Sequence, residues 1–273
     1  MNTSWRIIFA CQKGTPANAQ RVYNELIKAA LMYRYGGTGL AAVPVNDRDL
    51  TEAIFNLTDH DTITTNFEGV QRRITGKDLK ELFIASILLK HIEEKTRYVD
   101  GSGLFVVMPE TVGACDVGII VSKREDVKDH HGTALRLSPD HDPYPLQIKE
   151  YYDHSRAKEV VMVPRDVDVK KLERMVAGYE EYVLVLMRDM MNFNSAALQT
   201  FFDTHPRVAL ISMPRQPALT FTNTEGVEQE IVFPAGKHNY LVTFPDNAFS
   251  IVSFDWPPFL VPELPVSLLR HKN

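Results

Sequence analysis

The sequence predicts a protein of the α/β class, and two observations support this prediction. Between residues 77 and 189 the hydrophobic pattern changes between a helical period and short β-rich runs, in the order α, β, β, β, α, β. The run YVLVLM at residues 182–187 is apolar throughout, which is typical of a strand that is buried on both faces. Hydrophobic residues make up 44% of the 273 residues, which is ordinary for a packed globular core.

The pattern divides the chain into three segments: an N-terminal α/β segment of residues 1–76, a core of residues 77–214 and a β-rich C-terminal extension of residues 215–273. The first segment begins with the strand-like run WRIIFA. A helix follows from about Ala17 to Tyr35 and ends at the glycines of YGGTGL. A second short helix is predicted in DRDLTEAIFNL, and the polar run TDHDTITTNFEG is expected to connect it to the core.

The core segment opens with a helix in TGKDLKELFIASILLKHIEEKTRY. Thr75 is its candidate cap, and one apolar face is predicted through Leu82, Ala85, Leu88 or Leu89, and Ile92. Three strands are predicted next, in GLFVVMP, CDVGIIVS and YPLQIKEYY. They are followed by a helix in DVDVKKLERMVAGYEEY, a strand in YVLVLMRD, a helix in NSAALQTFFDTH and a strand in RVALISMP. In the first of these two helices one face is predicted to carry Leu172, Met175, Val176 and Tyr179.

The C-terminal extension is predicted to be rich in β-structure. Four short strands punctuated by Pro and Asn are expected in ALTFTN, QEIVFPAG, NYLVTFP and FSIVSFDW. The Pro-rich stretch WPPFLVPELPVSLL is expected to form an irregular tail.

Composition narrows the classes of protein to consider. A net charge of −5 disfavours binding of nucleic acid by overall charge alone, but it allows a local basic groove. Candidates for such a groove are Arg72, Arg73, Lys77 and Lys80, and a second pair, Arg156 and Lys158. The sequence shows no spanning apolar run and no secretory signal, so a cytoplasmic protein without a membrane partner is expected. Cys11 and Cys115 are far apart and are expected to be buried free thiols.

The strand YPLQIKEYY carries the candidate functional residues. Gln147 and Lys149 are two positions apart and therefore share one face of the strand, whereas Ile148 and Glu150 face the other way. If CDVGIIVS pairs with it in antiparallel fashion, Asp116 at the start of that strand comes to lie near its later half. An acid, an amide oxygen and an ammonium are then together. This set suits phosphodiester hydrolysis, which needs oxygen ligands for a divalent cation and positive charge near the phosphate.

These residues, in this order of elements, resemble the PD-(D/E)xK superfamily of restriction-endonuclease-like nucleases, in the variant where the motif is QxK. The resemblance implies an αβββαβ core with a mixed sheet flanked by helices. It implies that Asp116 binds the metal, that Gln147 takes the second acidic position, and that Lys149 is catalytic. The carbonyl of Ile148 is a further implied metal ligand. Glu81 matches the Glu that many members carry on the first core helix, and it is implied to take part in catalysis and metal binding.

What the resemblance implies about function is a metal-dependent endonuclease that uses Mg²⁺ or Mn²⁺. The implied partner is nucleic acid, DNA more than RNA, and a homodimer is one arrangement by which such enzymes reach both strands. Two features differ from the common family pattern. No Pro precedes Asp116, and the connection from Lys123 to Pro143 is long.

Several alternatives remain open at the level of sequence. Gln147 and Lys149 could form the wet face of a strand in a non-catalytic α/β binding protein, or in a regulatory subunit with a degenerate site. Asp140 follows a Pro, but seven strand residues would separate it from Gln147 by roughly 23 Å, so Asp116 is preferred over Asp140 and Asp142. The loop histidines His130, His131 and His141, with His154 after the strand, could bind zinc, although a solvated loop explains them more simply.

Overall fold

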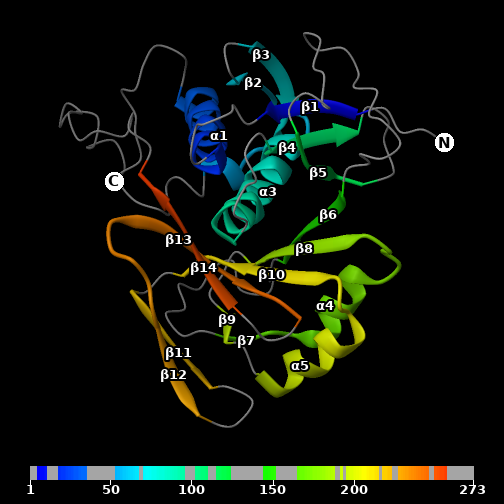
Figure 1. The fold of residues 1–273 in the computed structure, drawn as a ribbon, viewed down its shortest axis with the longest axis vertical. Helices are drawn as coiled ribbons and strands as arrows, with labels where there is room; N and C mark the ends of the chain where they lie inside the picture. The colour runs from blue at the N-terminus through cyan, green and yellow to red at the C-terminus, as the bar shows by residue number, and fades with distance from the viewer. Residues whose placement is uncertain are drawn as a thin grey trace. The chain divides into compact units, whose positions relative to one another are not determined.

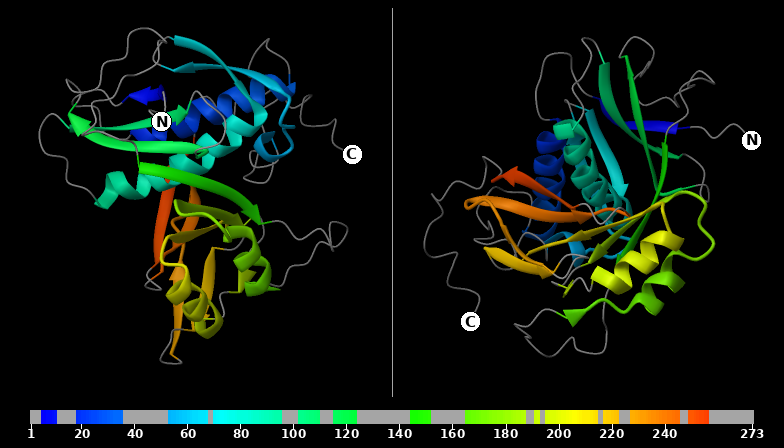
Figure 2. Two further views of the ribbon diagram at one scale, coloured as in Figure 1. Left: turned by 90° about the vertical axis from the view of Figure 1, so that its right-hand side faces the viewer. Right: turned by 60° about the horizontal axis from the view of Figure 1, so that its bottom comes forward.

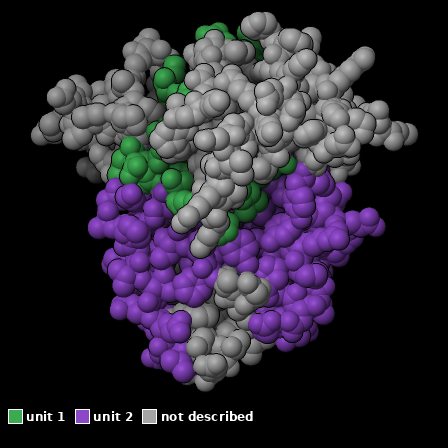
Figure 3. Space-filling model, viewed as in Figure 1, with its two compact units in different colours: residues 1–111, 119–143, 254–273 green, residues 112–118, 144–253 purple. Residues whose placement is uncertain are grey.

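The computed structural model describes residues 5–10, 18–35, 53–67, 70–95, 102–109, 115–123, 144–151, 165–187, 191–192, 195–214, 217–222, 227–245 and 249–256. The chain forms two compact units, which Figure 3 distinguishes by colour. Unit 1 comprises residues 1–111, 119–143 and 254–273. Unit 2 comprises residues 112–118 and 144–253. The division of the sequence into three segments at residues 76 and 214 stays a prediction.

Two helices form the centre of unit 1. They are α1 (Asn18–Tyr35) and α3 (Gly76–Lys95), and they pack against each other (Figure 1). The ring of Tyr23 on α1 is buried between them. Its centroid lies 5.2 Å from that of Phe83 on α3 and 4.0 Å from that of Phe254, with which it stacks. Both helices were predicted from the sequence, and the structure confirms them.

Helix α3 is buried on nearly every side, whereas the sequence pattern predicted a single apolar face. Every position from Glu81 to Leu89 is buried, because the run LFIASILL supplies apolar or small side chains all around the helix. The predicted cap is confirmed. The hydroxyl of Thr75 accepts a hydrogen bond from the Asp78 amide at 3.0 Å, and the Asp78 carboxylate accepts one from the Thr75 amide at 3.0 Å.

A hairpin occupies part of the polar region that the sequence pattern had marked as a connection. Its strands are β2 (Thr62–Phe67) and β3 (Val70–Thr75), which pair antiparallel. The expectation of a plain connection was therefore wrong. Side chains of the hairpin do alternate between buried and exposed positions, but one of the buried residues is the polar Thr65. Ile63 and Ile74 are the other two, and Thr62 and Thr64 are exposed. Of the predicted second helix, residues 53–55 are helical, and its beginning falls outside the described residues.

The other strands of unit 1 are β1 (Trp5–Ala10), β4 (Ser102–Pro109) and β5 (Val117–Lys123), which neighbour one another in that order. Strands β1 and β4 pair antiparallel. The first two residues of β5 are counted with unit 2, as is Asp116 before them. The strands β4 and β5 occur where GLFVVMP and CDVGIIVS predicted them.

Unit 2 contains three parallel strands joined by helices. Strand β6 (Tyr144–Tyr151) pairs parallel with β8 (Tyr182–Met187), and β8 pairs parallel with β10 (Val208–Ser212). Helix α4 (Val169–Val176) connects the first two strands and α5 (Ser195–Thr204) connects the second and third (Figure 1). Two short strands, β7 (Arg165–Asp166) and β9 (Met191–Asn192), pair beside them. The predicted alternation of helix and strand is confirmed here.

Helices α4 and α5 lie side by side and cover one face of this sheet (Figures 1 and 2). Their buried side chains, among them Leu172 and Phe202, pack on the inward residues of β8 and β10, such as Val185 and Leu210. Tyr151 at the end of β6 belongs to the same cluster. The alternate residues of β8 and β10 are buried as well, so both strands are covered on both faces, as the apolar run YVLVLM predicted.

Four strands follow in the C-terminal part: β11 (Ala218–Thr222), β12 (Glu228–Val232), β13 (Lys237–Thr243) and β14 (Phe249–Asp255). Strands β11 and β12 form a separate antiparallel pair, while β13 joins β10 antiparallel and β14 neighbours β13. All four were predicted. The sheet of unit 2 is therefore mixed and flanked by helices, and the chain belongs to the α/β class. In the described part of the chain, no helix is long and apolar enough to cross a membrane.

Candidate functional site

Strand β6 places Gln147 and Lys149 on the face that α4 and α5 cover. Their partners in the parallel ladder are Val183 and Val185, which both belong to the core cluster beneath the two helices. Gln147 is buried, with 8% of its surface exposed, whereas the side chain of Lys149 is 27% exposed. A polar amide inside an apolar layer is costly unless it is hydrogen-bonded, so this is not a wet strand face at Gln147.

Asp116 lies directly beside β6. Its amide donates a hydrogen bond to the carbonyl of Leu146 at 3.0 Å, and its Oδ2 accepts one from the amide of Ile148 at 2.8 Å. Leu146 and Ile148 are the third and fifth of the eight residues of β6. Asp116 therefore lies beside the middle of the strand, whereas the sequence pattern had predicted a place near its later half. The backbone of β6 therefore fixes both the position and the orientation of this carboxylate, which keeps 13% of its side-chain surface exposed.

The ammonium of Lys149 lies between an acid and an aromatic ring. Its Nζ is 3.9 Å from Oδ2 of Asp116 and 4.6 Å from the centroid of the Tyr179 ring. The carboxylate attracts the ammonium by charge, and the ring attracts it through its negatively charged face. The structure therefore brings together the Asp116 carboxylate, the Lys149 ammonium and the Ile148 backbone amide. The sequence pattern had predicted that this acid and this ammonium lie close to each other.

Tyr179 was predicted to lie on the apolar face of α4, and this prediction was wrong. Helix α4 ends at Val176, and Gly178 takes a positive φ of 84°, which reverses the chain as a glycine after a helix commonly does. Tyr179 therefore lies beyond the helix, 39% exposed, with its ring over Lys149. The signal that could have found it is the Gly in VAGYEEY, two residues after the last residue of the helix.

Glu81 belongs to unit 1, and its described contacts are there. It is 6% exposed on α3, and Oε1 lies 3.2 Å from Nζ of Lys77 one helical turn away. The burial agrees with a Glu directed away from water. Asp116, Gln147 and Lys149 belong to unit 2, so Glu81 is not part of the unit that holds the other candidate residues.

The other candidate residues divide between those with local partners and those outside the described residues. Lys77 contacts Glu81, and Lys80 lies 3.4 Å from Asp59 and donates to the Leu57 carbonyl. Lys77 and Lys80 of the predicted basic cluster therefore contact groups of unit 1. Cys115 is buried and is not part of a disulfide, as predicted. Arg72 and Arg73 lie on β3, where Arg73 is exposed. The following candidates lie outside the described residues: Cys11, His130, His131, Asp140, His141, Asp142, His154, Arg156 and Lys158.

The donor set at Asp116 suits a hard divalent cation. The carboxylate of Asp116 is an oxygen ligand of the kind that Mg²⁺ prefers, and Gln147 carries an amide oxygen on β6; Mg²⁺ is commonly held by one or two carboxylates together with waters and substrate phosphates. Among the described residues, no group of three or more His, Cys, Asp or Glu side chains is arranged to hold a metal ion.

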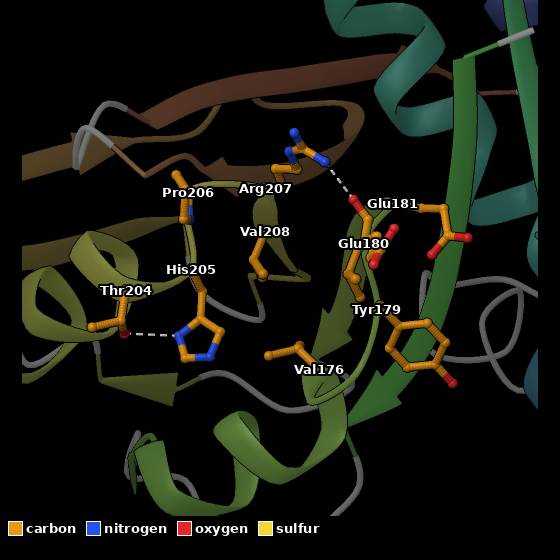
Figure 4. A pocket seen from close by; sticks show the side chains of 10 residues that line it. Val176, Tyr179, Glu180, Glu181, Thr204, His205, Pro206, Arg207 and Val208 are labelled. Carbon is orange, nitrogen blue, oxygen red and sulfur yellow. Dashed lines mark hydrogen bonds between the residues drawn. The ribbon is translucent and has the colours of Figure 1, made fainter.

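A cavity of about 310 Å³ lies within unit 2 (Figure 4). It lies where α4 leads into β8 and where α5 leads into β10. Tyr179 is part of its wall, so one residue belongs both to this cavity and to the surroundings of Lys149. The sequence pattern gave no indication of this cavity, because its walls come from two short turns that meet only in the fold. The lining residues are Val176, Tyr179, Glu180, Glu181, Val183, Thr204, His205, Pro206, Arg207 and Val208.

Comparison with protein-family models, with curated proteins and with solved structures found no match to this chain.

Proposed function

We propose that this chain is a metal-dependent nuclease that hydrolyses phosphodiester bonds, in DNA rather than RNA. The observation that carries the proposal is the 3.9 Å contact between Lys149 Nζ and Asp116 Oδ2, on a strand that also holds Gln147 buried beside them. A restriction-endonuclease-like core is part of the proposal. The succession of α3, β4, β5, β6, α4 and β8 follows the αβββαβ order of that core, apart from the two-residue strand β7.

The roles follow from the chemistry of each side chain. Asp116 and Gln147 would hold one or two Mg²⁺ or Mn²⁺ ions by their oxygens, with the Ile148 carbonyl as a further ligand. When bound, the metal supplies charge neutralisation at the phosphate and lowers the pKa of a bound water. Lys149 would orient the attacking water and place positive charge beside the five-coordinate phosphorus of the transition state.

The geometry around Lys149 supports this role. An ammonium tethered by a carboxylate and an aromatic ring has fewer conformations than a lysine on an open surface, so less freedom is lost when it meets a phosphate. The partial exposure of Lys149 and Asp116 leaves them within reach of a substrate, while the backbone contact at Ile148 fixes the carboxylate. DNA is the proposed partner, and a homodimer would let two such sites act on both strands.

The test is cleavage of linear DNA, circular DNA and RNA by the full chain, with Mg²⁺, with Mn²⁺ and with chelator. Lys149→Ala and Asp116→Ala are expected to lower the rate by about 10²–10³-fold, the usual loss when one transition-state electrostatic contact is removed. Lys171→Ala is the matched control. Lys171 makes the same kind of contact, with Nζ 4.4 Å from the centroid of the Tyr151 ring, and should leave the rate unchanged.

One observation favours a second candidate, a non-catalytic α/β binding protein. Oδ2 of Asp116 accepts the Ile148 amide, so this acid also has a purely structural task in fixing the segment before β5 to β6. A chain that cuts none of the three substrates with either metal, and binds Mn²⁺ equally well with and without Asp116→Ala, would support that candidate. Metal-dependent cutting that both variants lose while they remain folded would support the nuclease.

A further inference from the structure

We propose that the exposed face of the hairpin of β2 and β3 binds duplex DNA by lying in its major groove. The inference rests on the proposed function for the choice of DNA as the partner. The hairpin belongs to unit 1, whereas Asp116, Gln147 and Lys149 belong to unit 2. The proposed surface is therefore made of other residues than the site proposed for catalysis.

The two faces of the hairpin differ in burial. Ile63, Thr65 and Ile74 are buried on one face, since β2 contacts α1 and both strands contact α3. Side chains of a strand alternate between its two faces, so the residues next to these three point the other way. We call the opposite, exposed face the ribbon face, and its residues are Thr62, Thr64, Gln71 and Arg73.

Arg73 is the cation of the ribbon face. It lies directly opposite Thr64 in the antiparallel ladder, and Gln71 is two positions before it on the same face. Within the described part of the chain, the guanidinium of Arg73 makes no hydrogen bond and no ion pair. Its five N–H donors therefore remain for a partner that brings acceptors.

The charge of the hairpin suits a polyanion. Its two strands contain two arginines and no Asp or Glu, although the chain as a whole carries a net charge of −5. Asp61 and Asp78 are close in sequence, but they lie beside the end where Thr62 pairs with Thr75, and backbone amides donate to both carboxylates there. Glu68, in the connection between the strands, lies outside the described residues. The described ribbon face therefore presents a positive charge and no negative one.

The dimensions of the hairpin suit the major groove of DNA. This groove is about 12 Å wide and admits a two-stranded ribbon, whose strands lie about 4.8 Å apart. Strands β2 and β3 have six residues each and form a sheet of two strands among the described residues (Figures 1 and 2). Duplex RNA has a deep and narrow major groove that side chains cannot read, so the shape favours DNA.

The side chains of the ribbon face match the edges of bases in that groove. Arg donates two hydrogen bonds to O6 and N7 of guanine, Gln bonds to N6 and N7 of adenine, and Thr contacts the methyl group of thymine. Arg73 and Gln71 are separated by about 7 Å along the strand, which is the spacing of about two base pairs. Each of these two side chains can therefore meet a different base pair.

The experiment is binding of a short mixed-sequence DNA duplex to the full chain in chelator, measured by fluorescence anisotropy, so that cleavage does not enter. Arg73→Ala is expected to weaken binding about tenfold, the effect of losing one bidentate contact with a base. Gln71→Ala should weaken it in the same direction. Arg21→Ala is the matched control, because Arg21 is also an exposed arginine of unit 1 but lies on α1, and it should leave the affinity unchanged.

A second duplex tests the groove itself. Replacing its purines with 7-deazapurines keeps the base pairs but removes the N7 acceptors from the major groove. The unaltered chain should bind this duplex about tenfold more weakly than the ordinary one. Arg73→Ala should bind the two duplexes equally, since the group that uses N7 is gone.

Four results would overturn the proposal: no binding of duplex DNA at micromolar concentration, equal affinity of Arg73→Ala and the unaltered chain, equal affinity of the unaltered chain for the two DNA duplexes, or tighter binding of duplex RNA. Circular dichroism melting of each variant separates loss of the surface from loss of the fold. The outcome is independent of catalysis. Binding that needs Arg73 and N7 without any cutting would remove the nuclease and keep the ribbon face, and cutting without such binding would do the reverse.

Discussion

Lys149 and Tyr179 contact each other across the boundary between a strand and the turn that follows a helix, with the ammonium 4.6 Å from the ring centroid. This contact ties the end of α4 to β6. We expect a double-mutant cycle of Lys149→Met and Tyr179→Leu to give a coupling free energy of about 0.5–1 kcal/mol, the usual size of a partly exposed cation–π contact.

Urea unfolding of the four proteins measures this coupling free energy. Tyr179→Phe keeps the ring and should keep the coupling, which makes it the control for loss of the hydroxyl. A coupling indistinguishable from zero would mean that the ring and the ammonium are neighbours without stabilising each other.

Asp116 should contribute to stability as well as to the proposed chemistry. Its Oδ2 accepts the Ile148 amide at 2.8 Å, and hydrogen bonds to charged groups contribute about 1.5–3 kcal/mol. Asp116→Ala is therefore expected to lower the free energy of unfolding by about that amount, and Asp116→Asn, which keeps an acceptor oxygen, by less. The comparison is Asp203→Ala. Asp203 is exposed and accepts from Gln199 one helical turn away, so its loss should cost only about 0.2–0.5 kcal/mol. Equal losses at the two sites would contradict the structural role of Asp116.

Glycine is required at position 76 because there is no room for a side chain, and not because of the backbone conformation. A Cβ at this position would overlap the carbonyl oxygen of Thr58, and the Gly76 amide donates to the Asp61 carbonyl at 2.8 Å, so the two segments cannot easily separate. Gly76→Ala should destabilise unit 1 by about 1–3 kcal/mol, as overpacking does. Gly178→Ala is the contrasting case, with open space but a φ of 84°, and is expected to cost about 1 kcal/mol from backbone strain alone. Thermal melting of both variants tests whether Gly76→Ala lowers the melting temperature more than Gly178→Ala does. If Thr58 can move away from the added methyl group, Gly178→Ala will have the larger effect.

Tyr33 and Asp61 predict a dependence of stability on pH. The Tyr33 hydroxyl donates to Oδ1 of Asp61 at 2.7 Å, and the Thr58 amide donates to Oδ2 at 2.6 Å. The hydrogen bond from Tyr33 is the main cause that lowers the pKa of Asp61 below its ordinary value of 3.8, and the Thr58 amide adds to it. The stabilisation is therefore complete above about pH 4 and is lost as the pH falls through the lower folded pKa.

Replacing Tyr33 with Phe should raise the pKa of Asp61 towards its ordinary value, which an NMR titration of the side-chain carboxyl carbon would record. Tyr144→Phe is the control and should leave that titration unchanged. An unaltered Asp61 titration in Tyr33→Phe would show that the Thr58 amide alone sets the pKa. The same contact raises the pKa of the Tyr33 hydroxyl above 10.0, so its contribution is present below pH 10 and lost as the pH rises further.

Much of the fold could be predicted where the hydrophobic pattern is strong. The run at Val183–Met187 is apolar at every residue, and burial on both faces followed directly from that. The hairpin of β2 and β3 could not be found in this way. Its buried positions include Thr65, and the arginines of β3 hide the alternation that marks a strand.

The candidate site could be predicted in part for a similar reason. Gln147 and Lys149 follow from strand alternation, and Asp116 from the order of two neighbouring runs. The aromatic partner of Lys149 could not be predicted, because a continuous helical period was extended through Gly178 to Tyr179. The cavity was missed since His205 and Val176 are brought together only by two parallel crossovers, a long-range relationship that no local pattern contains.

The parallel pair of β8 and β10 has a consequence for how the cavity moves. The Val183 amide donates to the Arg207 carbonyl at 2.8 Å, so the two cavity walls are joined where the pair begins. Strands buried on both faces are usually among the last elements of a protein to exchange their amide hydrogens with solvent. The floor of the cavity, where Val183 and Val208 lie, should therefore stay closed on the timescale of minutes to hours, and a ligand would meet a preformed floor whose only adjustable parts are the side chains at its rim.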